Sequence, residues 1–360
     1  MRVLLAGGGT AGHTSPLIAT ADALVRRVPD VEITCLGTER GIETRVIPAA
    51  GYRLELIPPV PLPRRPSVDL LRVPGRLGAA VRASRAVVDR CRPHVVVGFG
   101  GYVSTPAYVV ARRLGLPLVI HEGNALPGLA NRFGALCCTR HVATSFPGTR
   151  LRHGRFIGLP IRRAIATLDR PARRAAAREH YGLDADLPTL LVTGGSQGAR
   201  RINESVGAVA ADLGRAGVQV LHVSGPKGSV PVPAPEPGAP PYIVVPFEER
   251  MELAYAAADA VVGRAGASSV TEAASLGLPA VFVPLPIGNG EQAANAAAVV
   301  AAGGAVLVAD ADFTPDWART HLPALLTDQA RLGAMSRAAA GLLHTDADEA
   351  LASLIIGVAR

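Results

Sequence analysis

Four glycine-rich segments of this sequence carry polar side chains that could bind an anion or move a proton. Glycine lets backbone N–H groups approach a phosphate closely, and the helix N-terminus that follows attracts negative charge. Hydroxyl groups in such segments can form further hydrogen bonds to a ligand. Imidazole and carboxyl groups can also accept or donate a proton near neutral pH. The segments read GGGTAGH at 7–13, GGYVST at 100–105, GGSQGA at 194–199 and GRAGASSVTE at 263–272.

The first segment combines an anion-binding loop with the imidazole of His13. Its glycines fit a dinucleotide fingerprint only loosely, and such a site also needs an acid at the end of the second strand. The residues expected there, Cys35–Thr38, include no acid, which disfavours a nicotinamide cofactor. His13 could act as a general base, bind a diphosphate or cap the helix.

The two later segments favour a nucleotide. The third lacks the Gly-Lys-Ser/Thr ending of a P-loop, yet its backbone and the Ser196 hydroxyl could still bind a diphosphate. In the fourth, small residues open a helix that carries Glu272, whose carboxylate would suit a ribose diol. The alternative for Glu272 is an acid that only stabilises the start of the helix.

Each segment follows a short apolar run and precedes a helical pattern. Continuous runs of Val, Leu and Ile predict parallel strands buried on both faces, and their alternation with helices predicts a doubly wound α/β fold. The pattern starts twice, so we predict two Rossmann-like domains, 1–159 and 160–342. Two glycine segments at strand ends of one domain point to one anion site between them. The runs are Val3–Ala6, Val95–Val97, Leu190–Val192 and Ala260–Val262.

Composition limits the class of protein. The chain has 360 residues, of which 49% are hydrophobic and 18% charged, so it can bury sizeable cores and is not disordered. Its four Cys residues form no CxxC pair, which argues against a zinc ribbon and fits a reducing compartment. The apolar stretches are short or broken by Gly, Pro or Asn, so we expect neither a membrane span nor a signal peptide.

Charge is unevenly distributed along the chain. The net charge of +8 divides into +13 for residues 1–162 and −5 for residues 163–360. Arg64–Arg92 alone carries +6, with apolar residues interleaved, so we predict that this segment lies on an anionic membrane surface. The alternative is an ordinary solvated, Arg-rich helix. A nucleic-acid partner is not expected, because the sequence has no aromatic-rich basic motif and its second half is acidic.

Seven motifs, in order along nearly the whole chain, resemble those of the MurG family of bacterial glycosyltransferases. They are GGGTAGHTSP at 7–16, GFGGYVSTPA at 98–107, HEGNALPGLANR at 121–132, GLPIR at 158–162, GGSQGA at 194–199, GRAGASSVTE at 263–272 and GEQAANA at 290–296.

The resemblance implies a GT-B fold, in which two Rossmann-like domains face each other across a cleft. Domain 1–159 would bind the acceptor and the membrane, domain 160–342 would bind UDP-GlcNAc, and the last helix, about 343–360, would pack back on the first domain. The implied reaction is inverting transfer of GlcNAc from UDP-GlcNAc to the MurNAc 4-hydroxyl of lipid I (undecaprenyl-pyrophosphoryl-MurNAc-pentapeptide), which gives lipid II. The enzyme would be a peripheral protein at the cytoplasmic face of the cell membrane, where it would serve peptidoglycan synthesis, cell shape and cell division.

The resemblance also implies roles for residues, with neither a metal nor an organic cofactor. The general base would be His13, with Glu122 as its rival. Acceptor diphosphate contacts are expected from Gly9, Thr10, Gly101, Tyr102 and Ser104. UDP-GlcNAc contacts are expected from Thr10, Gly12, His13, Asn124, Arg162, Ser196, Arg264, Ala267, Ser268, Ser269, Glu272 and Gln292.

Three positions depart from the family pattern. Gly123 stands where HEQN has Gln, Leu159 stands where GNPVR has Asn, and Glu291 precedes Gln292 where some members have a second Gln. Two other enzymes remain as alternatives. One is a GT-B glycosyltransferase with a soluble acceptor, and the other is a UDP-GlcNAc 2-epimerase, which would need no acceptor.

Overall fold

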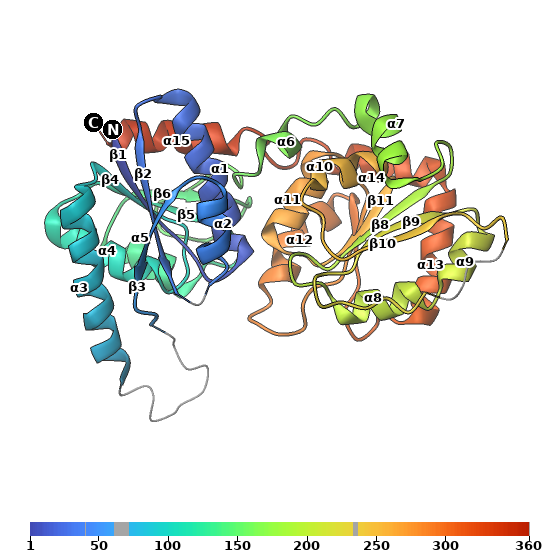
Figure 1. Cartoon of the computed structure of the whole chain (residues 1–360), viewed down its shortest axis with the longest axis horizontal. Helices are drawn as coiled ribbons and strands as arrows, with labels where there is room; N and C mark the ends of the chain where they lie inside the picture. Colours follow the sequence, from blue (N-terminus) through green and yellow to red (C-terminus); the bar gives the residue numbers. More distant parts are fainter. Residues whose placement is uncertain (40, 61–71, 233–236, 360) are drawn as a thin grey trace. The chain divides into compact units, whose positions relative to one another are not determined.

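The computed structural model describes residues 1–39, 41–60, 72–232 and 237–359. The chain divides into two compact units. Unit 1 comprises Met1–Arg162 with Thr345–Arg360, and unit 2 comprises Arg163–His344. Each unit is built on its own parallel sheet flanked by helices (Figure 1). The prediction of two Rossmann-like domains is confirmed at the level of the sheets.

Unit 1 contains a seven-stranded sheet in the order β3-β2-β1-β4-β5-β6-β7, and every neighbouring pair is parallel. The strands are β1 (Arg2–Ala6), β2 (Glu32–Thr38), β3 (Arg53–Ile57), β4 (Val95–Gly98), β5 (Leu118–Glu122), β6 (His141–Thr144) and β7 (Gly154–Phe156). The helices are α1 (Ala11–Arg27), α2 (Glu43–Ala49), α3 (Val73–Cys91), α4 (Ser104–Leu114), α5 (Leu129–Cys137) and α15 (Ala347–Val358).

Both faces of this sheet are buried, as the unbroken apolar runs predicted. Along β1, Leu4 belongs to the core under α3, α4 and α5, whereas Leu5 belongs to the core under α1 and α15. Successive strand residues point to opposite faces, so a strand between two helical layers needs an apolar residue at every position.

The last helix of the chain completes unit 1. Helix α15 runs beside α1 (Figure 1), and Leu351 and Ile355 are fully buried in the core that α1 covers. Arg26 near the end of α1 forms ion pairs with Asp348 at 2.6 Å and Glu349 at 2.7 Å.

Unit 2 contains a six-stranded parallel sheet in the order β10-β9-β8-β11-β12-β13. The strands are β8 (Thr189–Thr193), β9 (Gln219–Val223), β10 (Tyr242–Val245), β11 (Ala260–Gly263), β12 (Ala280–Phe282) and β13 (Ala305–Leu307). The helices are α6 (Arg163–Ala166), α7 (Arg170–Tyr181), α8 (Arg200–Gly207), α9 (Ala210–Arg215), α10 (Met251–Ala257), α11 (Ala267–Ser275), α12 (Glu291–Ala301), α13 (Pro315–Thr327) and α14 (Gln329–Ala339).

The strand order determines where each unit can bind a ligand. In unit 1 the order reverses between β1 and β4, and in unit 2 it reverses between β8 and β11. Loops that leave the carboxyl ends of such neighbouring strands diverge and open a crevice between them. The four strands are the ones that precede the four glycine segments, so each unit has one pair of glycine loops at its switch point.

Helix α3 alters the prediction of a membrane-lying segment. Residues 64–71 of that segment lie outside the described part of the chain. Within α3, Val87 and Val88 are buried in the core of unit 1, and Val73, Leu77 and Val81 are partly buried and pack against it. Its exposed residues include Arg82, Arg85 and Arg90, and Arg72 lies exposed just before its start. The described part of the segment therefore turns much of its apolar surface toward the core of unit 1, and its contact with a membrane stays a prediction. None of the described helices has the length and apolarity needed to cross a bilayer.

Candidate active site

The two glycine loops of unit 1 meet around the imidazole of His13. The loop after β1 leads into α1, and the loop after β4 passes Gly100 and Gly101, both at positive φ (+90° and +76°). A Cβ on Gly100 would stand 3.4 Å from His13 Nε2, and one on Gly101 would stand 3.0 Å from the Gly8 carbonyl oxygen. Glycine is therefore required at both positions, by conformation and by space.

Hydrogen bonds select one tautomer of His13. Its Nδ1 lies 3.1 Å from the Gly8 carbonyl oxygen and 3.2 Å from the Thr10 hydroxyl. A carbonyl only accepts, so the bond to Gly8 requires the proton on Nδ1 and leaves the Nε2 lone pair available. Within the described residues Nε2 has no hydrogen-bond partner.

The surroundings of His13 keep its ring neutral. Burial lowers its pKa, opposed in part by the bond to Gly8 and by the charge of Glu43. A neutral imidazole with a free Nε2 at pH 7 is equipped to accept a proton.

Glu122, the rival base, holds a loop together. Its buried carboxylate accepts hydrogen bonds from the backbone N–H groups of Asn124 at 2.9 Å and Gly128 at 3.0 Å, and from the Asn131 side chain at 2.9 Å. Tyr108 donates to the Asn131 oxygen at 2.6 Å, which fixes the orientation of that amide. Burial raises the pKa of Glu122, and the hydrogen bonds from Asn124, Asn131 and Gly128 oppose the rise.

Two of the residues expected at the acceptor diphosphate are engaged inside the protein. The Gly9 N–H donates to the Glu43 carboxylate at 2.8 Å, so it is not available to a ligand. Ser104 is fully buried, and its hydroxyl lies 2.9 Å from the Ala6 oxygen and 2.7 Å from the Gly100 oxygen. Ser104 thus ties the two glycine loops together and does not face a diphosphate. The expected contacts that remain on the surface are Thr10, Gly101 and Tyr102.

The corresponding crevice of unit 2 offers backbone N–H groups to an anion. Helix α11 begins after Gly266, and no side chain of the described residues caps its first turn. The N–H groups of Ala267, Ser268 and Ser269 therefore remain for a ligand at the positive end of the helix dipole. Ser196 lies exposed in the neighbouring loop.

Side chains around this crevice are held in place by neighbours. Tyr255 on α10 donates to the Glu272 carboxylate at 2.8 Å. The Gln292 oxygen accepts from the Leu285 N–H at 2.9 Å, which turns the amide NH2 of Gln292 toward other acceptors. Asn295 donates to the Ala265 carbonyl at 3.3 Å and so links α12 to the loop before α11.

Arg264 is bound within unit 2. One terminal nitrogen of its guanidinium lies 3.1 Å from the Val283 oxygen, 3.2 Å from the Pro284 oxygen and 2.5 Å from the Asp310 carboxylate. Asp310, in the loop between β13 and α13, therefore anchors the residue that follows β11. The described residues contain no group of three His, Cys, Asp or Glu side chains that could hold a metal ion.

Comparisons with known proteins agree with this geometry. The glycosyltransferase family 28 N-terminal domain matches residues 3–142 and the family 28 C-terminal domain matches residues 189–351. A Nocardioides sp. protein named UDP-N-acetylglucosamine–N-acetylmuramyl-(pentapeptide) pyrophosphoryl-undecaprenol N-acetylglucosamine transferase is 65% identical, over 99% of this chain and 98% of its own length. A Thermobifida fusca protein of the same name is 53% identical, over 100% of this chain and 95% of its own length. The chain belongs to the MurG family.

Solved structures agree with this family. The crystal structure of Acinetobacter baumannii MurG has a TM-score of 0.79 at 28% identity, with 99% of both chains covered. A calicheamicin glycosyltransferase, 18% identical with a TM-score of 0.69, shares the fold. The prediction of the family from seven motifs is confirmed, as is the prediction of a glycosyltransferase with the GT-B fold.

Two of the departures from the MurG pattern lie side by side. A Cβ on Gly123 would stand 3.7 Å from the Cδ1 atom of Leu159, and Leu159 is fully buried. The loss of a Gln side chain at one position and the gain of an apolar side chain at the other thus affect a single small region. Next to it, the buried His121 lies 3.2 Å from the Gly158 oxygen and 3.1 Å from the Ser145 hydroxyl, and burial lowers its pKa to about 4.

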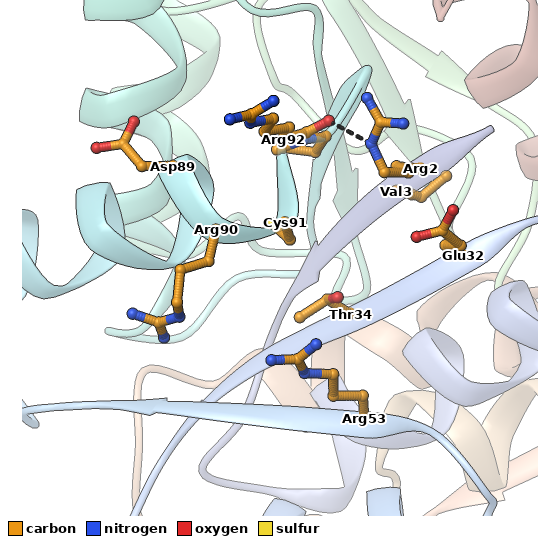
Figure 2. A pocket seen from close by; sticks show the side chains of 10 residues that line it. Arg2, Val3, Glu32, Thr34, Arg53, Asp89, Arg90, Cys91 and Arg92 are labelled. Atoms are coloured by element: carbon orange, nitrogen blue, oxygen red, sulfur yellow. Dashed lines mark hydrogen bonds between the residues drawn. The ribbon is translucent and has the colours of Figure 1, made fainter.

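A hollow of about 520 Å³ lies at the opposite edge of the unit 1 sheet, at the amino ends of β1 and β2. Figure 2 shows its arginines, with Arg2 donating to the Arg92 carbonyl at 2.8 Å. Arg53 and Arg90 both pair with Glu55, at 2.7 Å and 2.6 Å. Ligands of doubly wound sheets bind at the carboxyl ends of the strands, so we do not assign this hollow to the family's reaction.

Several structural partners in the MurG site were not predicted from the sequence. Glu43, Tyr255 and Asp310 lie outside the glycine segments, and nothing in their local pattern indicates a contact with one. Asn131 stands within the motif HEGNALPGLANR, so that motif could have suggested it. Arg162 is the last residue of the first stretch of unit 1 and is exposed, and its role remains a prediction.

Proposed function

We propose that this chain transfers N-acetylglucosamine from UDP-GlcNAc to the MurNAc 4-hydroxyl of lipid I and so forms lipid II. The observation that carries this proposal is 65% identity, over nearly the full length, to a protein named for that activity. The two crevices support it, because one offers a neutral imidazole and the other offers uncapped N–H groups suited to a diphosphate.

Unit 1 supplies the base in this reaction. His13 Nε2 removes the proton of the 4-hydroxyl as its oxygen attacks the anomeric carbon of GlcNAc. The bond between that carbon and the diphosphate oxygen breaks on the opposite face, which inverts the configuration and gives a β-linkage. Acceptor diphosphate contacts come from Thr10, Gly101 and Tyr102.

Unit 2 binds the donor and stabilises the charge that develops on UDP. The first turn of α11 and the Ser196 hydroxyl bind the diphosphate. Glu272, positioned by Tyr255, binds the ribose hydroxyls, and the NH2 group of Gln292 donates to a GlcNAc hydroxyl. Arg264 orients the loop before α11. From unit 1, Gly12 and Asn124 contact the sugar, and Arg162 contacts the uracil or orients the base.

The test is a UDP-release assay with UDP-GlcNAc, run with and without a lipid I analogue. Release that depends on the acceptor, together with a disaccharide product, is expected. Formation of the 2-epimer without acceptor would support the epimerase alternative, and equal transfer to an acceptor without the diphosphate would support a soluble-acceptor enzyme. Full activity in the presence of a chelator is expected, because helix N-termini neutralise the leaving group in this scheme. A strict requirement for a divalent metal would contradict it.

We further propose that the enzyme works as a peripheral protein at the cytoplasmic face of the cell membrane, in support of wall growth and division. Helix α5 carries an exposed apolar stripe of Leu129 (69% exposed), Phe133 (40%) and Leu136 (62%). These residues are spaced i, i+4 and i+7 and so share one helix face. Arg132 and Arg140, also exposed, would add attraction to anionic lipids.

Sedimentation with vesicles tests the membrane proposal. Binding should rise with the fraction of anionic lipid, and the pair Leu129→Ser and Leu136→Ser should weaken it. The matched control is Leu307→Ser, an exposed apolar residue of unit 2. Binding that ignores lipid charge, or that the control weakens equally, would contradict the proposal.

A further inference from the structure

A buried carboxylate supports the glycine loop that carries His13. Glu43, the first residue of α2, is fully buried. One of its oxygens accepts from the Gly9 N–H at 2.8 Å, and the other accepts from the Thr38 N–H at 3.0 Å and the Thr38 hydroxyl at 2.9 Å. All three partners are donors, so both carboxylate oxygens act as acceptors.

The chain leaves room for this carboxylate with three glycines. A Cβ on Gly8 would stand 2.5 Å from a Glu43 carboxylate oxygen, and one on Gly37 would stand 2.7 Å from its Cγ. A Cβ on Gly41 would collide with the same carboxyl group. The end of β2, the loop after β1 and the start of α2 are therefore shaped around one side chain.

The bond to Gly9 leads to the imidazole through a single peptide group. The Gly9 N–H and the Gly8 carbonyl belong to the same planar unit, and in a trans peptide they point in opposite directions. Glu43 accepts from the N–H side, and His13 Nδ1 donates to the carbonyl side at 3.1 Å. A carboxylate on the N–H polarises the peptide and makes its carbonyl a better acceptor.

We propose that Glu43 is a positioning residue for glycosyl transfer, which acts through the Gly8–Gly9 peptide to hold His13 with its proton on Nδ1 and its lone pair on Nε2. This inference rests on the proposed function, in which His13 is the base. A carboxylate plays the same part when it orients a catalytic histidine directly, and here one peptide group stands between the two.

The arrangement in which Glu43 acts on His13 through the Gly8–Gly9 peptide, called the relay below, should have a measurable electrostatic effect. The negative charge of Glu43 raises the pKa of His13, against the lowering caused by burial. The loop after β4 approaches the ring through Gly100 and Gly101, and a Cβ on Gly100 would also stand 3.2 Å from the Asn131 amide nitrogen; none of these groups carries a charge. Loss of the Glu43 charge should therefore lower the pKa of His13 further, and the acid limb of the pH profile should move to lower pH.

The experiment compares Glu43→Gln, His13→Ala and the double variant in the UDP-release assay with a lipid I analogue. Glutamine has one acceptor oxygen, so it cannot accept from both Gly9 and Thr38. For Glu43→Gln we expect kcat to fall about 10- to 100-fold, in the range found for groups that orient a histidine. The KM for UDP-GlcNAc should stay within about twofold, since uniform binding is not affected. The double variant should be no slower than His13→Ala, because the two residues act as one unit.

The matched control is Asp348→Asn, which weakens the ion pair in the same unit between the buried Asp348 and the partly exposed Arg26. Arg26 lies 13 residues along α1 from His13, about 20 Å at the rise of an α-helix. This variant should lose stability but keep the wild-type acid limb. A shift of the acid limb in the control equal to that in Glu43→Gln would overturn the assignment.

The outcomes separate this inference from the proposed function. If His13→Ala is inactive while Glu43→Gln keeps the wild-type kcat and acid limb, the relay is overturned. The assignment of His13 as the general base is then still supported. If His13→Ala keeps normal turnover, both are overturned. Should Glu43→Gln not fold, nitrogen-15 NMR of the labelled imidazole in the unaltered protein decides. A proton on Nδ1 supports the relay, and a proton on Nε2 overturns it.

Discussion

The substitution Glu122→Gln distinguishes a general base from a loop clamp. As a base, Glu122 would lose a proton acceptor and kcat would fall by about 10²- to 10⁴-fold, with little change in stability. If Glu122 is instead a loop clamp, the single oxygen of the glutamine would keep only the hydrogen bond to Asn124. Its NH2 group would then face the Gly128 N–H and the Asn131 NH2, which now donate to the carboxylate.

The size of the clamp effect follows from these contacts. Two buried donors would lose their acceptor, and each costs about 1–3 kcal/mol. Removal of a buried charge offsets part of this, since burial already raises the pKa of Glu122. We therefore expect the free energy of unfolding of unit 1 to fall by about 2–4 kcal/mol, and kcat to fall less than about tenfold. Asn131→Ala should destabilise unit 1 to a similar extent, because it removes a donor and leaves the carboxylate in place.

The assay must report on unit 1. The single tryptophan, Trp317, lies in α13 of unit 2, so its fluorescence follows unit 2 alone. Urea unfolding by circular dichroism, with tryptophan fluorescence as an internal reference, separates the two units. If turnover drops by about two orders of magnitude or more while unit 1 unfolds as in the wild type, the clamp is refuted and Glu122 is the base.

Further predictions concern stability and the donor site. His121 has its pKa lowered to about 4 from 6.5, so between these values the unfolded chain binds more protons. The stability of unit 1 should then fall by about 2 kcal/mol from pH 7 to pH 5, measured by urea unfolding, and His121→Gln should remove this slope. Tyr255→Phe should raise the KM for UDP-GlcNAc about fivefold, through loss of one bond to Glu272 worth about 1 kcal/mol, and an unchanged KM would disprove the positioning role. Leu159→Asn should cost about 1–3 kcal/mol in thermal or urea unfolding, and adding Gly123→Gln should recover part of it if the two positions are coupled.

The sheets and the switch points were predictable because their signals are local. Runs such as Val95–Val97 indicate a strand buried on both faces. The glycines that follow indicate that the ligand binds at the carboxyl end of that strand. The partners of the site were not predictable in this way. Glu43 is an ordinary surface-type residue in the sequence, and it acquires its role only because three glycines separated along the chain make a space for its carboxyl group.

For the apolar residues of α3, the sequence pattern leaves the environment of the side chains undetermined. Their alternation with arginine predicts an amphipathic helix, and periodicity cannot tell whether the apolar face meets lipid or the protein's own core. Ser104 is a similar case, since a hydroxyl after a glycine loop resembles a phosphate ligand until its burial is known. Burial depends on how distant segments pack, so it is the property that sequence pattern conveys least.

The place of α15 has a consequence for how the protein is made. A ribosome releases residues 1–162 long before residues 345–360, and the interval spans the whole of unit 2. At about 5–20 residues per second, the face that receives Leu351 and Ile355 stays uncovered for roughly 10–40 s. During synthesis the first unit is therefore an unfinished domain with an apolar surface exposed. Its completion waits until α15 has been synthesised, which makes it the part of the nascent chain that a chaperone would be expected to bind.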